Sequence, residues 1–253
     1  MIKETVLMVS EVCVRFGGVV AVRDASLELR EAEVVGLIGP NGAGKSSLVG
    51  ALGGQLPVAG GRVLLGDVDI TSASPHRRAR LGLGRTFQLT STFDGLTVFD
   101  NLLVAALAAG GSGLWGSLAG GRVRRARLAA ATDAVWSRLT EFEMAEVASR
   151  YGAELSGGQR RLVEIMRCLM QSPRVLLLDE PMVGVAPHLV ERIGAECARI
   201  AASGVGIIVV EHALEVVQAI CDRVVVMASG AVVAQATYAE AMSSGAVREA
   251  YFA

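Results

Sequence analysis

The sequence predicts an α/β fold with a parallel core sheet, an N-terminal antiparallel β subdomain and an inserted α-helical subdomain. Short, wholly apolar runs at 34–38, 175–178 and 206–210 have the composition of buried parallel strands. The β-branched runs within residues 5–30 are separated by glycine and aspartate, which favours a small antiparallel sheet. Helical spacing across residues 97–144 interrupts the β/α alternation and indicates an insert.

The first apolar run leads into the stretch GPNGAGKSS at 39–47, and a second apolar run follows it. This is the phosphate-binding pattern G-x-x-x-x-G-K-S in its required setting between strand and helix. Glycines let successive N–H groups turn toward phosphate oxygens, and the helix adds its positive end. The residues predicted to contact a nucleotide are Gly39, Asn41, Gly42, Ala43, Gly44, Lys45, Ser46 and Ser47. The alternative, a glycine-rich turn that only caps a helix, does not account for the full pattern.

The composition and the positions of the lysines exclude some classes of ligand and partner. The 24 cationic side chains include only two lysines, Lys3 and Lys45, so a compact ammonium was needed at position 45. A GTPase is excluded, because neither lysine has the neighbours of a guanine-reading N/T-K-x-D motif. The net charge of −1 gives no reason to expect nucleic acid binding. The four cysteines are widely spaced and are expected to be small core residues.

Two adjacent acids, Asp179 and Glu180, end the apolar run at 175–178. Buried carboxylates are costly unless they meet a cation or do chemistry. In a phosphate-binding protein, Asp179 would fix Mg²⁺ and Glu180 would polarise the attacking water. The next core strand ends at His212, where βα loops collect ligands, although a lone histidine is usually structural.

The stretch LSGGQ at 155–159 carries a capping box, with Ser156 at the start of a helix and Gln159 three residues later. A capped helix start beside glycines is also an anion site, so the structural and functional interpretations are compatible.

Three further segments have open interpretations. The basic helix at 74–81 could form a phosphate or partner patch, but a solvated face is favoured. Helices are expected at 97–109 and from Arg122 toward Met144, the second with Leu128, Ala131, Val135 and Leu139 on one stripe. Between them lies an uncharged, glycine-rich loop at 110–121, whose Leu114, Trp115 and Leu118 would contact a membrane partner, lipid or the helical lobe.

The motifs together resemble the ATP-binding subunit of ABC transporters over essentially the whole chain. The matching stretches are GPNGAGKSS (Walker A), RTFQ (Q-loop), LSGGQ (signature), VLLLDEP (Walker B) and VEH (switch histidine), in the family's order. The resemblance implies a RecA-like P-loop NTPase core at 1–88 and 160–235. It also implies a helical subdomain at 89–159, C-terminal helices at 236–253, and a head-to-tail dimer holding two ATP molecules.

Several residue roles follow from the resemblance alone. Phe16 would stack on adenine, although the pattern around it favours an ordinary core aromatic. Gln88 would touch Mg²⁺ and the attacking water, completing a metal set with Ser46 and Asp179. Glu180 would act as general base and His212 as γ-phosphate sensor. In trans, Ser156 and Gly158 of the signature would cap the γ-phosphate, and Gly157 and Gln159 would belong to the same nucleotide-binding set.

Within the family, three stretches resemble the subfamily for branched-chain (hydrophobic) amino acid uptake. They are MVGVAP, LTVFDNLLVAA and AVREAYFA. Similar endings occur in the lipopolysaccharide-export ATPase, so lipid export is the alternative function. A soluble ABC ATPase of DNA repair or translation is less favoured, because it would normally carry a long coiled-coil insert or a second P-loop, and this sequence has neither. Many ABC ATPases have an aspartate a few residues after the Walker B glutamate, in the loop that crosses to the other subunit. This sequence has Ala186 at the corresponding place, and the uptake subfamily also lacks the aspartate.

The implied partners are a second copy or a paralogous ATPase, transmembrane permease subunits, and a periplasmic or lipid-anchored solute-binding protein. The N-terminus has no basic segment leading into an apolar stretch. We therefore expect a cytoplasmic chain, peripheral on the inner face of the membrane.

Overall fold

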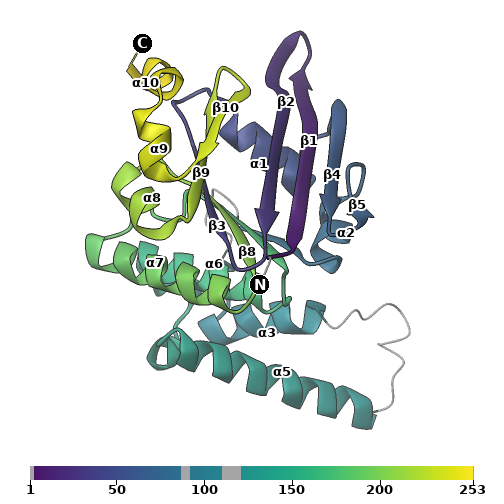
Figure 1. Cartoon of the computed structure of the whole chain (residues 1–253). Coiled ribbons are helices and arrows are strands. Elements are labelled where there is room, and N and C mark those ends of the chain that lie inside the picture. The colour runs from purple at the N-terminus through teal and green to yellow at the C-terminus, as the bar shows by residue number, and fades with distance from the viewer. Residues whose placement is uncertain (1–2, 87–91, 110–120, 253) are drawn as a thin grey trace. The chain divides into compact units, whose positions relative to one another are not determined.

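The computed structural model describes residues 3–86, 92–109 and 121–252 (Figure 1). The chain divides into two compact units. The first consists of Met1–Gln88, Pro173–Val183 and Pro187–Ala253, and the second of Leu89–Ser172 and Gly184–Ala186. The domain boundaries inferred from the sequence remain predictions, since compactness alone does not define a functional domain.

The first unit contains the predicted antiparallel sheet. Its strands are β1 (Thr5–Phe16), β2 (Val19–Arg30), β4 (Gly60–Leu65) and β5 (Val68–Asp69), in the order β2-β1-β4-β5. Gly17 turns the first hairpin with a φ of 58°, and Gly66 turns the hairpin of β4 and β5 with a φ of 56°. Both turns need a left-handed backbone, which glycine adopts without penalty.

The core sheet of the same unit is parallel except at one edge. Its strands are β3 (Val34–Ile38), β6 (Leu83–Arg85), β7 (Val175–Asp179), β8 (Gly206–Val210), β9 (Arg223–Ala228) and β10 (Ala231–Ala236), in the order β10-β9-β3-β8-β7-β6. Among its described strands, only β9 and β10 pair antiparallel. Every residue of β3, β7 and β8 is buried, as their apolar runs predict. Their carboxyl ends therefore share one edge, where the predicted site residues follow.

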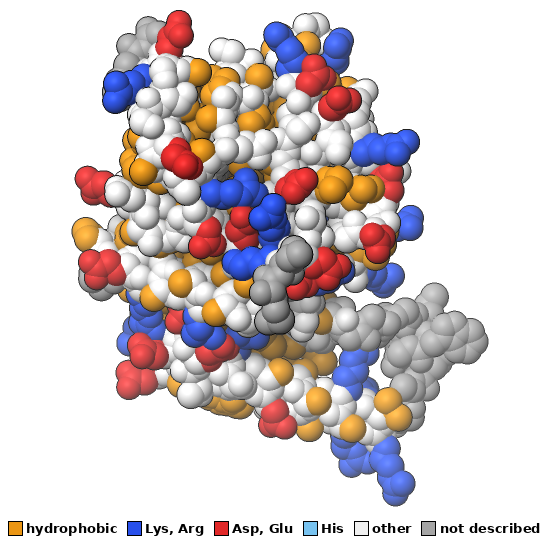
Figure 2. All heavy atoms as spheres, viewed as in Figure 1, with side chains coloured by type: hydrophobic (Ala, Val, Ile, Leu, Met, Phe, Trp, Pro, Cys, Tyr) orange, Lys and Arg blue, Asp and Glu red, His pale blue; other side chains and the backbone are white. Residues whose placement is uncertain are grey.

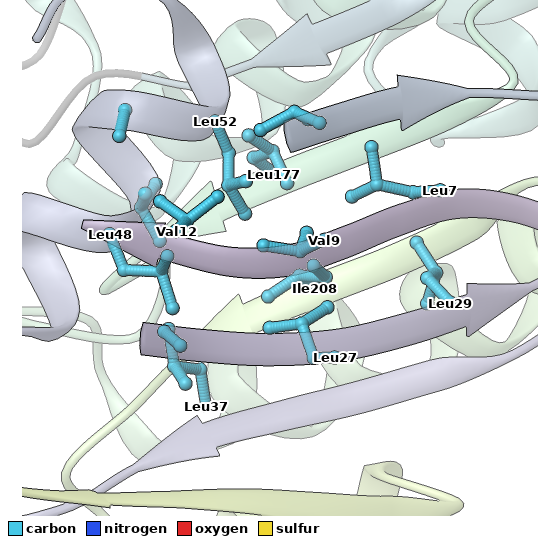
Figure 3. Packing of buried hydrophobic residues seen from close by; sticks show 14 of the residues in the cluster. Leu7, Val9, Val12, Leu27, Leu29, Leu37, Leu48, Leu52, Leu177 and Ile208 are labelled. Carbon is cyan, nitrogen blue, oxygen red and sulfur yellow. The ribbon is translucent and has the colours of Figure 1, made fainter. Parts of the chain in front are cut away.

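Six helices of the described first unit accompany the two sheets. They are α1 (Lys45–Gly53), α2 (Pro75–Arg80), α7 (Pro187–Ala202), α8 (Leu214–Ile220), α9 (Tyr238–Ser243) and α10 (Gly245–Phe252). One hydrophobic cluster joins both sheets to α1. Figure 3 shows leucines of β1, β2 and α1 converging with Leu177 and Ile208 of the core strands. The helix carrying the phosphate-binding loop is therefore packed into the largest described core.

The basic helix α2 corrects one sequence expectation. Arg78 is 1% exposed and belongs neither to a solvated face nor to a phosphate patch. Its guanidinium donates to the backbone oxygens of Ala51 (2.5 Å) and Leu52 (2.6 Å) at the C-terminal end of α1. Unsatisfied carbonyls at a helix end favour a cation, so Arg78 is a buried cap for α1.

The second unit is helical. It contains α3 (Val98–Ala109), α5 (Gly121–Glu141), α6 (Gly157–Leu169) and the short 3-10 helices η1 (Ala145–Val147) and η2 (Gly152–Glu154). On α5 the predicted stripe is buried at Ala131, Val135 and Leu139, but Leu128 is 45% exposed, because only the second half of α5 is covered. The apolar loop predicted at 110–121, with Leu114, Trp115 and Leu118, lies almost wholly outside the described residues.

Two further features of the molecule are the charges on its surface and the lengths of its described helices. Figure 2 shows acidic and basic side chains intermixed on the face that it draws, in keeping with the net charge of −1. Across residues 3–86, 92–109 and 121–252, no helix has both the length and the apolar character needed to cross a membrane.

Candidate active site

The loop between β3 and α1 has a backbone that only glycine tolerates at two positions. Gly39 has a φ of 149°, and a Cβ there would lie 2.1 Å from the carbonyl oxygen of Met227. Gly44 has a φ of 99°, and its Cβ would lie 2.5 Å from the carbonyl oxygen of Ala21. These contacts seat the loop against neighbouring backbone, so the sequence motif has a steric reason.

The start of α1 is left open. Its N-cap residue Gly44 provides no side-chain hydrogen bond, and the first turn contains no acidic residue. The first N–H groups of a helix lack intrahelical partners and carry partial positive charge. An anion placed at this helix start would meet both features.

Lys45 is held within its own loop. Its Nζ donates to the backbone oxygens of Gly39 (2.7 Å) and Pro40 (3.0 Å), and the residue is buried. Burial lowers the pKa of Lys45 from its ordinary value, while the nearby Glu180 carboxylate opposes part of this shift. The two hydrogen bonds hold the ammonium beside the open start of α1.

A cavity of about 590 Å³ lies over this loop within the first unit. Its lining consists of Val19, Val20, Ala21, Asn41, Gly42, Ala43, Gly44, Lys45, Ser46, Ser47, Glu180, His212, Ser229 and Gly230. The structure thus brings together most of the predicted loop contacts with the predicted base and the predicted sensor. A volume of this size suits a small organic ligand.

Glu180 and His212 form a pair at the edge of this cavity. His212 Nε2 lies 2.9 Å from Glu180 Oε1. Glu180 directly follows β7, and His212 lies two residues after the end of β8. Glu180 has a φ of 49°, which is uncommon for a residue with a side chain. Left-handed backbone of this kind often marks functional sites, because it costs energy that packing must offset.

Asp179 meets a cation that sequence reasoning missed. Its Oδ2 accepts a hydrogen bond from Arg85 at 3.0 Å, and the carboxylate is 1% exposed. Arg85 also donates to the backbone oxygen of Val49 in α1, at 3.2 Å. The other oxygen, Asp179 Oδ1, is buried without a hydrogen-bond partner among the described residues. A buried carboxylate oxygen with unused capacity is suited to a hydrated Mg²⁺ ion.

Two other residues near the site carried no sequence signal. Glu211 is 2% exposed and accepts backbone hydrogen bonds around the Glu180–His212 pair. Burial raises the pKa of Tyr251 to about 12, partly offset by a backbone hydrogen bond with Gly39. The contacts of Glu211 with Met182 and of Tyr251 with Gly39 are not visible in the sequence, because each joins segments far apart along the chain.

Phe16 corrects another expectation. It is not an ordinary core aromatic, since it is 48% exposed at the end of β1, paired with Val19 across the hairpin turn. Val19 lines the cavity, whereas Phe16 is not among its lining residues. Gln88, the remaining predicted residue of the metal set, lies outside the described residues.

The predicted signature residues lie in the second unit. Ser156 Oγ accepts from Gln159 N at 3.3 Å, and Gln159 Oε1 accepts from Ser156 N at 3.0 Å. The capping box expected from LSGGQ is therefore present at the start of α6. Gly157 lies opposite Gly184, whose carbonyl oxygen would be 3.3 Å from a Cβ on Gly157.

A glycine-built loop, an uncapped helix start, a buried lysine and an acid–histidine pair around one cavity define a nucleotide phosphate-binding cassette. The ABC transporter family profile matches residues 22–183. The high-affinity branched-chain amino acid transport ATP-binding protein BraF of Pseudomonas aeruginosa is 36% identical over 255 residues, covering 97% of each chain. The lipopolysaccharide export system ATP-binding protein LptB of Escherichia coli is 33% identical over 232 residues, covering 91% of this chain and 90% of LptB.

Solved structures of ABC transporter cassettes resemble this chain as well. The crystal structure of a nucleotide-free ATP-binding cassette from an ABC transporter matches with a TM-score of 0.85 at 30% identity, covering 98% of this chain and 99% of that one. The chain belongs to the ABC transporter family, as its ATP-binding subunit and ATPase. The predicted α/β fold with its antiparallel β subdomain is confirmed. Membership implies ATP as ligand and the other subunits of a transporter as partners.

Proposed function

We propose that this chain powers the import of branched-chain amino acids. The observation that carries the proposal is the likeness to BraF along the full length of both chains. The stretch MVGVAP points the same way, whereas the ending AVREAYFA resembles both the uptake subfamily and the lipopolysaccharide-export ATPase. The partners would be a second copy or a paralogous ATPase, transmembrane permease subunits, and a periplasmic or lipid-anchored solute-binding protein. The chain would then work from the cytoplasm on the inner face of the membrane.

In the proposed reaction, water attacks the γ-phosphorus of ATP, Glu180 takes up the water proton, and ADP leaves. The 2.9 Å contact between Glu180 and His212 supports a joint role, in which His212 senses the γ-phosphate and keeps the carboxylate oriented. Lys45 and the open start of α1 would hold the phosphates. Phe16 would supply a stacking surface for adenine beyond the cavity.

The buried, unpartnered Asp179 Oδ1 supports Asp179 as one Mg²⁺ ligand, with Ser46 and Gln88 as the others. When bound, Mg²⁺ neutralises phosphate charge. The signature residues Ser156, Gly157, Gly158 and Gln159 would close the site of a second ATPase in a head-to-tail dimer. Hydrolysis would then depend on dimer formation, which couples it to a conformational cycle.

The test is uptake of labelled leucine, isoleucine and valine by cells of the source organism, comparing wild type with Lys45→Ala. We expect Lys45→Ala to abolish uptake, because the phosphates lose their fixed ammonium. Loss of uptake at normal protein level, restored by the wild-type gene, supports the importer. Unchanged uptake would contradict it and would favour lipid or lipopolysaccharide export, for which the 33% identity to LptB is the specific support. That function would be tested next by lipopolysaccharide surface assays in the same strains.

A further inference from the structure

Glu211 is a buried carboxylate that accepts backbone hydrogen bonds from two different loops. Its Oε1 accepts from the N–H of Met182 at 2.9 Å, and its Oε2 accepts from the N–H of His212 at 3.2 Å. A further backbone hydrogen bond comes from Ala213. Both carboxylate oxygens are therefore used, and within the described part of the chain each of these bonds is to a main-chain N–H.

The two loops held in this way carry the acid–histidine pair. Met182 stands two residues after Glu180, and His212 directly follows Glu211. The N–H of Glu180 also donates to Val210 O at 3.0 Å, which extends the pairing of β7 with β8 by one residue. Beyond that point the sheet ends, and within the described residues the Glu211 carboxylate is what ties the two backbones together next.

A carboxylate is a costly way to join two strand ends. Burial raises the pKa of Glu211, and the neighbouring Glu180 raises it further, against the lowering effect of its backbone hydrogen bonds. No lysine or arginine of the described residues forms an ion pair with it. A buried charge without a cation lowers the stability of the fold. Its presence therefore calls for a reason other than stability. The purpose that the contacts indicate is alignment of Glu180 with His212.

We propose that Glu211 is a positioning residue for hydrolysis. It fixes the backbone on both sides of the Glu180–His212 contact and thereby sets the direction in which Glu180 presents its carboxylate to water. The inference rests on the roles proposed above for Glu180 and His212. A displacement of about 1 Å in such a site can cost on the order of 100-fold in rate, so a small change in these loops is sufficient.

The test uses Glu211→Gln in the purified 253-residue chain. The amide keeps one acceptor oxygen, but its NH₂ group would face a second N–H donor, so one loop must be released. We expect kcat for ATP hydrolysis to fall about tenfold or more, with KM for ATP and the Kd of a non-hydrolysable ATP analogue within about twofold of wild type. If KM and kcat changed together, or if neither changed, the positioning role would be wrong.

A matched control is Glu33→Gln. Glu33 is another buried carboxylate of the first unit that accepts a backbone N–H, from Arg30 at 2.8 Å, but it precedes β3 and contacts neither loop. It also pairs with Arg223, so its replacement should cost at least as much stability. We expect a lower melting temperature with kcat unchanged. An equal loss of kcat in both variants would mean that Glu211 acts only through stability.

A double-mutant cycle separates this inference from the proposed roles. If Glu211 acts through His212, Glu211→Gln should have less than a twofold effect in a His212→Ala background, whereas independent effects would multiply. Multiplying effects would overturn the inference. If His212→Ala and Glu180→Gln themselves leave kcat unchanged, the proposed roles fail instead. Should Glu211→Gln melt below the assay temperature, Glu211→Asp replaces it, with a smaller loss of kcat expected because both acceptors remain on a shorter side chain.

Discussion

The starts of α1 and α6 both have glycines at or beside the first turn, yet they are completed in different ways. At α1, Gly44 adopts a left-handed backbone and supplies no side-chain cap. At α6, Ser156 and Gln159 close a reciprocal capping box. One helix start leaves its N–H groups to a ligand, whereas the other satisfies part of its own demand.

The C-terminal ends of the two helices differ in a similar way. α1 has no basic residue in its last turn and receives the Arg78 guanidinium from α2. α6 carries its own Arg167 there, stacked 4.5 Å above the Phe93 ring. The basic group at the C-terminal end of α1 therefore comes from another helix, whereas the last turn of α6 has a basic residue of its own. The three predictions that follow test this difference.

The largest effect is expected from Gly44→Ala compared with Gly157→Ala. A methyl group on Gly44 would meet a carbonyl oxygen at 2.5 Å on a left-handed backbone, whereas Gly157 offers 3.3 Å. Gly44→Ala should lose more than about 2 kcal/mol of unfolding free energy together with detectable ATP binding. Gly157→Ala should lose less than about 1 kcal/mol of unfolding free energy. Because Gly157 is predicted to contact only the nucleotide of a second subunit, the isolated chain should still bind ATP through its own phosphate-binding loop. Urea unfolding and nucleotide titration measure both, and equal losses would refute the contrast.

An intermediate effect is expected from Arg78→Met. The substitution keeps the apolar stem but removes the guanidinium from Leu52 O and from Ala51 O, which then keeps, among the described residues, only the Gly54 N–H at 3.1 Å. This loss should lower the unfolding free energy by about 2–4 kcal/mol. Arg78→Lys, which keeps the charge but not the fork, should lose about half as much. Arg77→Met, on the exposed face of the same helix, is the control and should stay within about 0.5 kcal/mol. A loss equal to that of the control would show that α1 needs no external cap.

The smallest effect is expected from Ser156→Ala compared with Ser46→Ala, both without nucleotide. Ser156→Ala removes half of a capping box and should cost about 1 kcal/mol. Ser46 is exposed in the first turn of α1, which has no side-chain cap, so its replacement should stay within about 0.5 kcal/mol. Thermal unfolding of the two variants measures the difference. The reverse order of stability would contradict the assignment of caps.

Much of the fold was predictable because its signals are local. The apolar runs of β3, β7 and β8 lie on buried strands, the capping box opens α6, and the glycines of the phosphate-binding loop have the backbone that their motif requires. Each signal depends on neighbours within about four residues, a distance over which sequence pattern carries physical meaning. The roles of the site residues beyond these local features stay predictions.

The partners of the buried charges were not predictable. Asp179 was expected to need a cation, but Arg85 lies 94 positions away in the sequence. Arg78 reaches Ala51 across 27 positions, and Glu211 reaches Met182 across 29. Basic residues on a short helix give no sign that one of them will be buried, so the solvated-face interpretation of Arg78 was wrong.

The sequence alone determined the phosphate-binding loop, the signature cap, the buried strands and membership in a family of transport ATPases. The tertiary structure decided which side chains share the site. Because β7 pairs with β8 in parallel register, the residues that follow the two strands meet. Glu180 thereby contacts His212, and Glu211 accepts backbone hydrogen bonds from Met182 and His212. Strand order is fixed by packing of the whole sheet, which no short stretch of sequence encodes.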